Sequence, residues 1–445
     1  MVSDKEIIRS IRRITGPAIV SNITTPLLGL VDVAITGHLG SAAYIGAIAV
    51  GTTMFNMLYW LFGFLRMGTA GLTSQSAGAD DTRACDAHLQ RSLLLALLFG
   101  LCLIALGGFL KEFVLDYLQP DEVTRPLAAR YFNVLIWGAP ATLGLFALNG
   151  WQLGMQNSQL PMVVAVSLNL VNIILSAILV FGFGMQMEGV ATGTLVAQWF
   201  GFLFSLIATV CLYGPKRARL RELLEHNSVV RLFKVNADIF LRTLCLVAVT
   251  TWFTRAGSEQ GVDTLAANAL LMQLFIFFSY FSDGYAYAGE ALAGKFYGAH
   301  DIIDLRRLTV ILLKRSAVVA LIFTAAYFIA GELIFSLLTD NEGVRAMAAD
   351  YKYWVISIPV CSVSAFIFDG IAVGLTHTRG MLVSMACAML IFFLTYFTLR
   401  GLMGNHALWL AFLLYLAFRG LILGRILYPR VIARQNHNPA NGQNN

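Results

Sequence analysis

The chain has 445 residues, of which 58% are hydrophobic and only 13% are charged. An ordinary soluble domain carries about 25% charged residues, so this composition excludes a soluble globular protein. The net charge of +6 at pH 7 follows from an uneven distribution of Lys and Arg between loops, and it does not indicate nucleic-acid binding.

Twelve segments are long and apolar enough to cross a bilayer as helices, since about 20 residues span its hydrocarbon core. In chain order the predicted spans are 14–37, 43–68, 92–111, 131–153, 160–184, 188–213, 237–256, 264–289, 315–338, 353–375, 381–400 and 405–427. The predicted fold class is therefore an all-α integral membrane protein with twelve transmembrane helices. The six cysteines are scattered without metal-binding spacing, so no metal site is predicted.

The chain is predicted to form an N-terminal lobe at residues 1–213 and a C-terminal lobe at 237–430. A basic cytoplasmic linker loop, 214–236, joins them, and 431–445 form a polar tail that is predicted to be disordered. Lys and Arg are concentrated in the linker and on the side of the two termini. The positive-inside rule therefore places both termini in the cytoplasm.

The two lobes resemble each other when the sequence is shifted by 220 residues. The matching pairs include Gly37 with Gly257, Tyr131 with Tyr351, Gly150 with Gly370 and Gly154 with Gly374. Each copy holds six spans, so both copies enter the membrane in the same orientation. Two parallel six-helix lobes related by an internal repeat are a common transporter plan.

Asp32 is a carboxylate within the first span, where a charge costs about 2.5–3.5 kcal/mol on the insertion scale. Asn22, Thr25 and Gly29 share its helix face. An acid at this depth without a basic partner can hold a proton or coordinate a small cation, which predicts a site coupled to an ion gradient. Pro26 interrupts the same helix and, with Gly29, is predicted to form a hinge.

Polar side chains also follow one face of the fifth and sixth spans. They are Asn169, Asn172 and Ser176 on the fifth span, and Thr194 and Gln198 on the sixth. Their counterparts 220 residues later are apolar or aromatic, namely Met389, Phe392, Tyr396, Leu414 and Phe418. A polar site specific to the first lobe is favoured over the alternative of ordinary hydrogen bonding between membrane helices.

Charged residues within the spans of the second lobe suggest a structural role rather than an ion-coupling role. Arg242 and Asp283 lie at similar depths on the seventh and eighth spans, and we predict a structural ion pair between them. Asp369 stands alone in the tenth span as a possible second polar site. Arg242 and Arg419 fall near predicted cytoplasmic helix ends, where long side chains reach the headgroups.

Three stretches resemble the multidrug and toxic compound extrusion (MATE) family, specifically its DinF-like branch: "SNITTPLLGLVDVAITGHLGS", "FGFLRMGTAGLTSQSAGA" and "LAANALLMQLFIFFSYFSDGYAYAGEALAGKFYG". The resemblance covers residues 10 to 430 approximately. It implies export of cationic or amphiphilic compounds against an inward flow of H⁺ or Na⁺. It matches the essential acid of the first helix to Asp32, supporting polar residues to Asn149, Asn172 and Thr194, and a proline linked to coupling to Pro26.

Ser176 departs from the family pattern, because relatives place a second Asp at this position of the fifth helix. A single carboxylate favours H⁺ over Na⁺ as the coupling ion. By counting residues along the spans, Asn149 lies nearer the cytoplasmic end than Asp32. Only a longer or displaced fourth helix would bring the two residues together.

The sequence argues against two other function classes. A flippase for a lipid-linked precursor would need a basic cleft for its anionic pyrophosphate, whereas here the intramembrane acid is unpaired. An intramembrane enzyme would need paired Asp-rich motifs, or Ser and His inside spans, and the histidines fall in loops or at span ends. We therefore expect a non-enzymatic, cation-coupled antiporter in the bacterial inner membrane. It is expected to act as a monomer, with no cofactor besides the coupling ion and no nucleic-acid partner.

Overall fold

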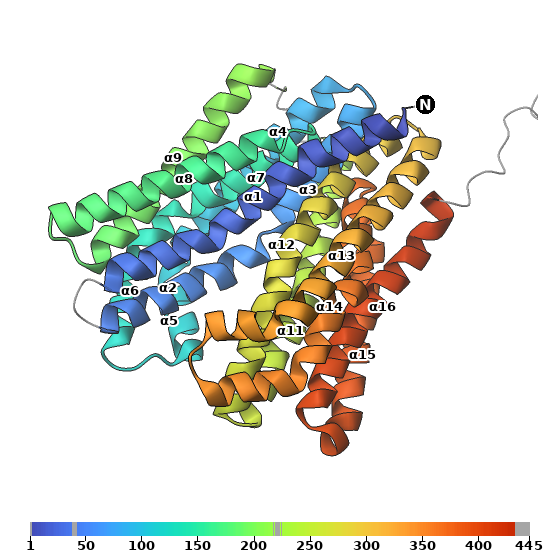
Figure 1. The fold of residues 1–445 in the computed structure, drawn as a ribbon. Helices are drawn as coiled ribbons and strands as arrows, with labels where there is room; N and C mark the ends of the chain where they lie inside the picture. Colours follow the sequence, from blue (N-terminus) through green and yellow to red (C-terminus); the bar gives the residue numbers. More distant parts are fainter. Residues whose placement is uncertain (1, 38–41, 217, 219–222, 224, 432–445) are drawn as a thin grey trace, which may run out of the picture. The chain divides into compact units, whose positions relative to one another are not determined.

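The computed structural model describes residues 2–37, 42–216, 218, 223 and 225–431, and within these ranges the chain is helical almost throughout, with no strand (Figure 1). The predicted tail falls outside the described residues beyond Val431. Ten of the described helices are long and apolar enough to cross a membrane, and the other two predicted spans lie on helices α1 and α11. The all-α membrane fold class is confirmed.

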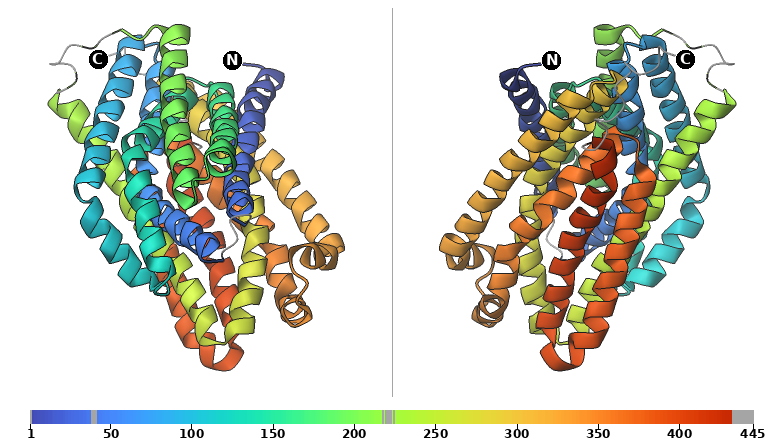
Figure 2. Two further views of the ribbon diagram at one scale, coloured as in Figure 1. Left: turned by 90° about the vertical axis from the view of Figure 1, so that its left-hand side faces the viewer. Right: turned by 90° about the vertical axis from the view of Figure 1, so that its right-hand side faces the viewer.

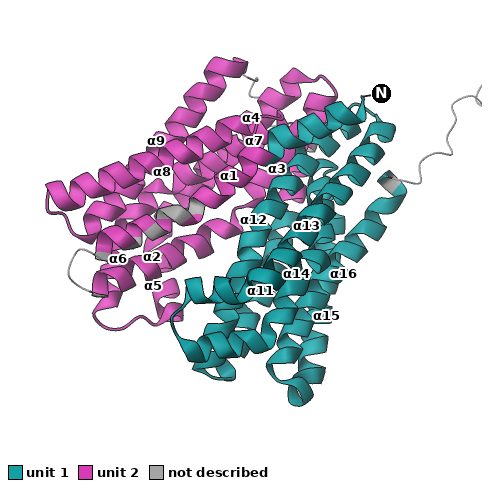
Figure 3. Ribbon diagram, viewed as in Figure 1, with its two compact units in different colours: residues 1–15, 237–445 teal, residues 16–236 magenta. Residues whose placement is uncertain are grey.

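The helices form two compact units (Figure 3): unit 1 comprises residues 1–15 and 237–445, and unit 2 comprises residues 16–236. The chain start belongs to unit 1 because Arg307 donates to the Val2 carbonyl (2.7 Å) and pairs with Asp4 (2.6 Å). Residues from the predicted linker belong to unit 2. There Arg91 Nε donates to the Leu223 carbonyl at 3.1 Å.

Unit 2 contains most of α1 and ten further helical segments. The segments are α1 (Asp4–Gly37), α2 (Ala42–Leu61), α3 (Phe64–Gly78), α4 (Thr82–Ala105), α5 (Gly107–Leu118), α6 (Thr124–Leu135), the 3₁₀ turn η1 (Ile136–Gly138), α7 (Ala139–Gly154), α8 (Gln159–Ala177), the π-helical turn η2 (Ile178–Gly182) and α9 (Met187–Tyr213). Four predicted spans are thus interrupted or changed in pitch. These changes occur at or beside Gly63, Gly107, Gly138 and Gly182, and glycine in a helix interior lowers the stability of the helix relative to alanine.

Unit 1 has long helices without such interruptions. Figure 2 draws them in colours from yellow-green to red: α11 (His226–Glu259), α12 (Val262–Gly298), α13 (Ile302–Leu338), α14 (Glu342–Gly374), α15 (Thr378–Met403) and α16 (Asn405–Val431). Helix α11 enters this unit at residue 237. Asp283, Tyr327 and Ile358 stand 220 residues after three of the break glycines, so the second copy lacks the signal for a break. Helix α11 begins within the predicted linker, because a helix satisfies its own backbone and need not end at the bilayer surface.

The 220-residue repeat extends to details of packing. Gly150 of α7 packs against the backbone of Arg66 on α3, and Gly370 of α14 packs in the same way against Ala286 on α12. Left-handed backbone occurs at equivalent positions in both copies: Asp80 with His300, and Gln156 with Thr376. Asp81 and Asp301 both cap the N-terminus of the next helix. The predicted internal repeat is confirmed by these shared contacts.

Candidate functional site

Asp32 lies near the end of α1 in unit 2 and is only 5% exposed. Its Oδ1 is buried and accepts no hydrogen bond from any described residue. The Asp32 backbone carbonyl accepts a hydrogen bond from Thr36 Oγ1 at 2.8 Å, which stabilises the last turn of the helix. The carboxylate is therefore held on an ordered helix, while its Oδ1 has no donor among the described residues.

The polar residues predicted on the fifth and sixth spans meet each other in unit 2. Asn172 Nδ2 on α8 donates to Thr194 Oγ1 on α9 at 2.8 Å, and Thr194 in turn donates to the Val190 carbonyl at 3.0 Å. Ser176 lies one turn after Asn172 on α8. It packs directly against Gly193, where a side chain would collide with the serine backbone. Asn172 and Ser176 are fully buried.

Tyr131 on α6 links Asp32 to this pair, and sequence reasoning assigned it no functional role. Its side chain lies near those of Thr52 and Thr194, and close enough to Asp32 for an electrostatic interaction. The ring is 2% exposed and packs over Gly51 of α2, whose missing side chain makes room for it. In the sequence, Tyr131 stands at the start of the fourth predicted span. It was noted only because it matches Tyr351 in the 220-residue repeat.

The cluster of Asp32, Tyr131, Asn172, Ser176 and Thr194 contains buried oxygens without hydrogen-bond donors. Asp32 Oδ1, Asn172 Oδ1 and Ser176 Oγ have no partner among the described residues. A buried polar atom without a partner needs a physical explanation, such as a bound proton, water or ion. Carboxylate, amide and hydroxyl oxygens suit a proton or a hard cation. No group of three or more His, Cys, Asp or Glu residues in the described ranges could hold a metal ion.

Asn149 is not joined to this cluster by any hydrogen bond between described residues, and its buried Oδ1 has no partner. It stands 18 residues after Tyr131 on the same span, which places it roughly 27 Å further along the helix axis. In unit 1 the counterparts of Asn22 and Asn149, which are Arg242 and Asp369, contact each other. The structure therefore supports a position for Asn149 nearer the opposite end of α1.

Helix α1 stays helical through Pro26 in this conformation. Asn169 Nδ2 on α8 donates to the Thr24 carbonyl at 2.9 Å, two residues before the proline. Neighbouring side chains commonly satisfy backbone groups near a proline in a membrane helix. Nothing lies within 4 Å of the position where Gly29 would carry a Cβ in this conformation. The hinge role of Pro26 and Gly29 remains a prediction.

Tyr131→Phe is expected to reduce transport several-fold while leaving the fold intact. The variant keeps the ring over Gly51 but removes the hydroxyl that lies near Thr194 and Asp32. Even if the hydroxyl made one hydrogen bond, its loss would cost about 0.5–1.5 kcal/mol, too little to unfold the protein. Transport in proteoliposomes and thermal unfolding in detergent measure the two effects. Tyr327→Phe is the matched control, since that buried hydroxyl donates only to the Leu274 carbonyl of unit 1. Equal transport by both variants would contradict the role of Tyr131.

The corresponding region of unit 1 is aromatic. Phe392 and Tyr396 stand at the positions of Asn172 and Ser176, and their rings stack with centroids 6.5 Å apart. Trp252 stands at the position of Asp32 and packs edge-on against Phe393 at 5.8 Å. The polar cluster consequently belongs to one copy of the repeat, as its sequence asymmetry predicted.

Unit 1 has a buried charged cluster elsewhere, and it corrects two expectations. Asp369 of α14 accepts hydrogen bonds from Arg242 of α11 and Arg419 of α16, and all three residues are less than 10% exposed. Arg242 thus pairs with Asp369 rather than with Asp283, and Asp369 is not alone. Arg242 and Arg419 turn toward the protein interior instead of reaching for headgroups. Arg419 also lies 5.8 Å from the ring centroid of Phe366.

The error in the predicted pairing has a geometric cause. Depth along a helix fixes one coordinate, but the partner also depends on which face each helix turns and which helices are neighbours. Asp283 on α12 interacts electrostatically with Arg419. The four charges therefore balance, which is the expected condition for ions buried in a membrane protein.

Two repeated bundles of long apolar helices, with the Asp32 carboxylate buried in one bundle and its Oδ1 without a partner in the described ranges, define a multi-pass membrane transporter. The MatE family model matches residues 17–178 and 239–397, once in each copy of the repeat. The chain belongs to this family.

Known proteins agree with this assignment. The chain is 40% identical to DNA damage-inducible protein F of Escherichia coli, over 92% of this chain and 90% of that one. It is 25% identical to a probable multidrug resistance protein NorM of Deinococcus radiodurans, over 95% of both chains. The solved structure of the Vibrio cholerae MATE transporter VcmN in the bent form has the same fold. Its TM-score is 0.86 at 17% identity, and the match covers 97% of this chain and 98% of that one.

Proposed function

We propose that this protein is a proton-coupled antiporter that exports cationic or amphiphilic compounds by alternating access. The observation that carries the proposal is the buried Asp32 carboxylate, whose Oδ1 has no partner in the described part of the chain. The NorM relative is named a probable multidrug resistance protein, which supports drug-like substrates. Ser176 supplies a hydroxyl rather than a second carboxylate, and this favours H⁺ over Na⁺.

Proton binding would change the hydrogen bonds that Asp32 can form with its surroundings. An ionised carboxylate is only an acceptor, whereas a protonated one also donates. The hydroxyl of Tyr131 is a donor in the cluster that lies within electrostatic range of Asp32. A change of protonation therefore rearranges this network and shifts α1 between two shapes about Pro26. A ligand that favours one shape then shifts the population of the whole transporter.

The flippase alternative receives no support from the charges within the membrane. A carrier of lipid pyrophosphate needs cationic groups that are free to bind phosphate. The buried guanidinium groups of Arg242 and Arg419 are instead both bound to Asp369. We further propose that the protein acts as a monomer in a bacterial inner membrane, with both termini in the cytoplasm, as the distribution of Lys and Arg indicates.

Transport under separate ion gradients tests the coupling ion. Purified protein in proteoliposomes should move a fluorescent cationic dye when a pH gradient alone is imposed. A sodium gradient at uniform pH should give no more dye movement than protein-free vesicles. Transport driven by sodium alone, with no response to the pH gradient, would contradict proton coupling.

Pro26→Ala should lower the transport rate severalfold and leave the affinity for the dye nearly unchanged. Alanine restores a backbone donor and removes the ring that weakens the helix, so α1 bends less readily. Pro17→Ala is the matched control, because Pro17 lies in the same helix but farther from Asp32. Dye binding in detergent and transport in proteoliposomes separate the two quantities. Unchanged turnover in Pro26→Ala would exclude the hinge.

A further inference from the structure

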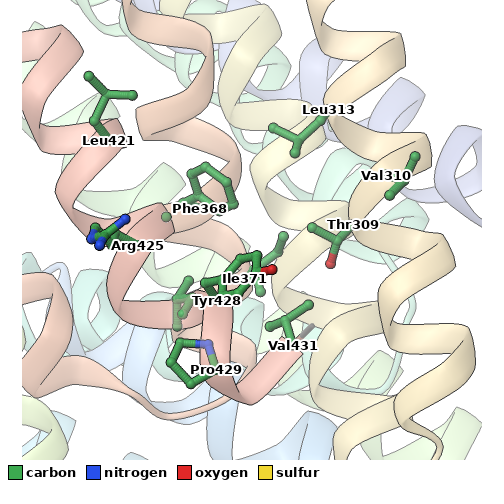
Figure 4. A pocket seen from close by; sticks show the side chains of 12 residues that line it. Thr309, Val310, Leu313, Phe368, Ile371, Leu421, Arg425, Tyr428, Pro429 and Val431 are labelled. Atoms are coloured by element: carbon green, nitrogen blue, oxygen red, sulfur yellow. The ribbon is translucent and has the colours of Figure 1, made fainter. Parts of the chain in front are cut away.

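Unit 1 has a groove of about 590 Å³ between α13, α14 and α16, a size typical of ligand sites. Figure 4 shows Thr309, Val310 and Leu313 on one side and Leu421, Arg425 and Tyr428 on the other. Phe368 and Ile371 of α14 lie between the two sides. Gly424 leaves room for the Phe368 ring, because a Cβ there would lie 2.7 Å from it.

The groove opens on a surface that faces lipid. Val310 is 47% exposed and Leu421 is 62% exposed, and both belong to helices that qualify as membrane spans. The rest of the lining is mostly apolar. Such a surface in a membrane span is solvated by acyl chains, so a hydrocarbon chain is the natural occupant of the groove.

Arg425 is the one charged residue among those that line the groove. It is exposed at the rim, and it forms no ion pair or hydrogen bond with the part of the chain that the structure describes. It lies within about one turn of Pro429, where the candidate span ends, so its guanidinium reaches the headgroup region. Tyr428 adds an amphipathic side chain of the kind enriched at membrane interfaces.

The repeat shows that helix packing does not require this arginine. A groove of about 470 Å³ in unit 2 is lined by Gln90 and Leu93, the counterparts of Val310 and Leu313. The counterpart of Arg425 is Ser205, which is fully buried and accepts a hydrogen bond from Gln152 at 2.9 Å. The same fold is therefore built with a neutral, internally bonded residue at this position.

We propose that the groove of unit 1 binds an anionic phospholipid, with its phosphate on Arg425 and one acyl chain along Leu421, Phe368 and Leu313. Arginine forms strong, directional hydrogen bonds with phosphate oxygens. Basic pockets between membrane helices on the cytoplasmic side bind anionic headgroups, and the positive-inside rule places this end of α16 there. A cationic compound would be repelled by Arg425, so a transported drug is the less favoured occupant.

Native mass spectrometry of the full-length protein in detergent tests this site with phosphatidylglycerol and with phosphatidylcholine of the same acyl chains. The wild type should retain phosphatidylglycerol preferentially. Arg425→Gln should weaken its binding about fivefold and leave phosphatidylcholine unchanged. Leu421→Trp narrows the groove while keeping the arginine, and it should also weaken binding of phosphatidylglycerol.

Arg83→Gln is the matched control, because Arg83 is exposed at the start of α4 and lines neither groove. It should bind phosphatidylglycerol like the wild type. Equal retention of the two lipids by the wild type, or an Arg425→Gln variant with unchanged preference, would overturn the proposal. If one bound cationic dye displaced one bound lipid, the groove would be assigned to the transported substrate instead. Asp32→Asn should keep the lipid preference, so a failure of the coupling proposal is distinguishable from a failure of this one.

Discussion

Asp32→Asn is expected to reduce proton-driven export to the level of protein-free vesicles. Asparagine has nearly the shape of aspartate but cannot bind and release a proton in the physiological range. The substitution removes a buried carboxylate whose Oδ1 has no donor among the described residues, so folding should remain near normal. Export of a cationic dye under an imposed pH gradient measures the loss, and thermal unfolding in detergent checks the fold.

Asp80→Asn is the control for this experiment. Asp80 is exposed and has a left-handed backbone with φ 56°, which asparagine tolerates as readily as aspartate. It should transport like the wild type. Export by Asp32→Asn at the wild-type rate, under the same gradient, would remove Asp32 from the coupling site.

Asp369→Ala is expected to cause the largest loss of stability in unit 1. The carboxylate binds both Arg242 and Arg419 in the protein interior, and its removal leaves two buried guanidinium groups without their anion. Removing one partner of a buried ion pair typically costs about 3–5 kcal/mol. Thermal unfolding in detergent should show a large decrease in Tm. Glu259→Ala is the control, because its ion pair with Arg255, at 3.2 Å, lies at the surface of the same unit and should contribute about 1 kcal/mol at most.

A double-mutant cycle distinguishes the observed pair from the predicted one. Arg242→Ala together with Asp369→Ala should destabilise the protein by less than the sum of the two single changes, since the charges compensate each other. Arg242→Ala together with Asp283→Ala should be closer to additive. Additivity for the first pair, with strong coupling in the second, would contradict the contacts seen in the structure.

The sequence predicted the membrane helices well, because hydropathy alone marks long apolar segments. The interruptions near Gly63, Gly107 and Gly138 were not predicted, since an isolated glycine in an apolar segment does not distinguish a continuous helix from a broken one. The repeat offered a usable signal. The second copy replaces these glycines with Asp283, Tyr327 and Ile358, and its helices are continuous.

The site was predicted in part. The contact between Asn172 and Thr194 follows from residues on facing stripes of consecutive helices, and the asymmetry of the repeat pointed to it. Tyr131 was missed because tyrosine near a span end is common at membrane interfaces. The predicted partner of Arg242 was wrong, because the depth of a residue in the membrane does not determine which face of its helix contacts which neighbour. Those relations depend on the packing of helices that are distant in sequence.

Proton release on substrate binding tests most directly whether Asp32 carries the coupling ion. A cationic dye added to purified protein in weakly buffered detergent solution should release protons, up to about one per transporter, because the cluster has a single carboxylate. Asp32→Asn should bind the dye and release none. The same proton release from Asp32→Asn as from the wild type would contradict proton coupling at Asp32.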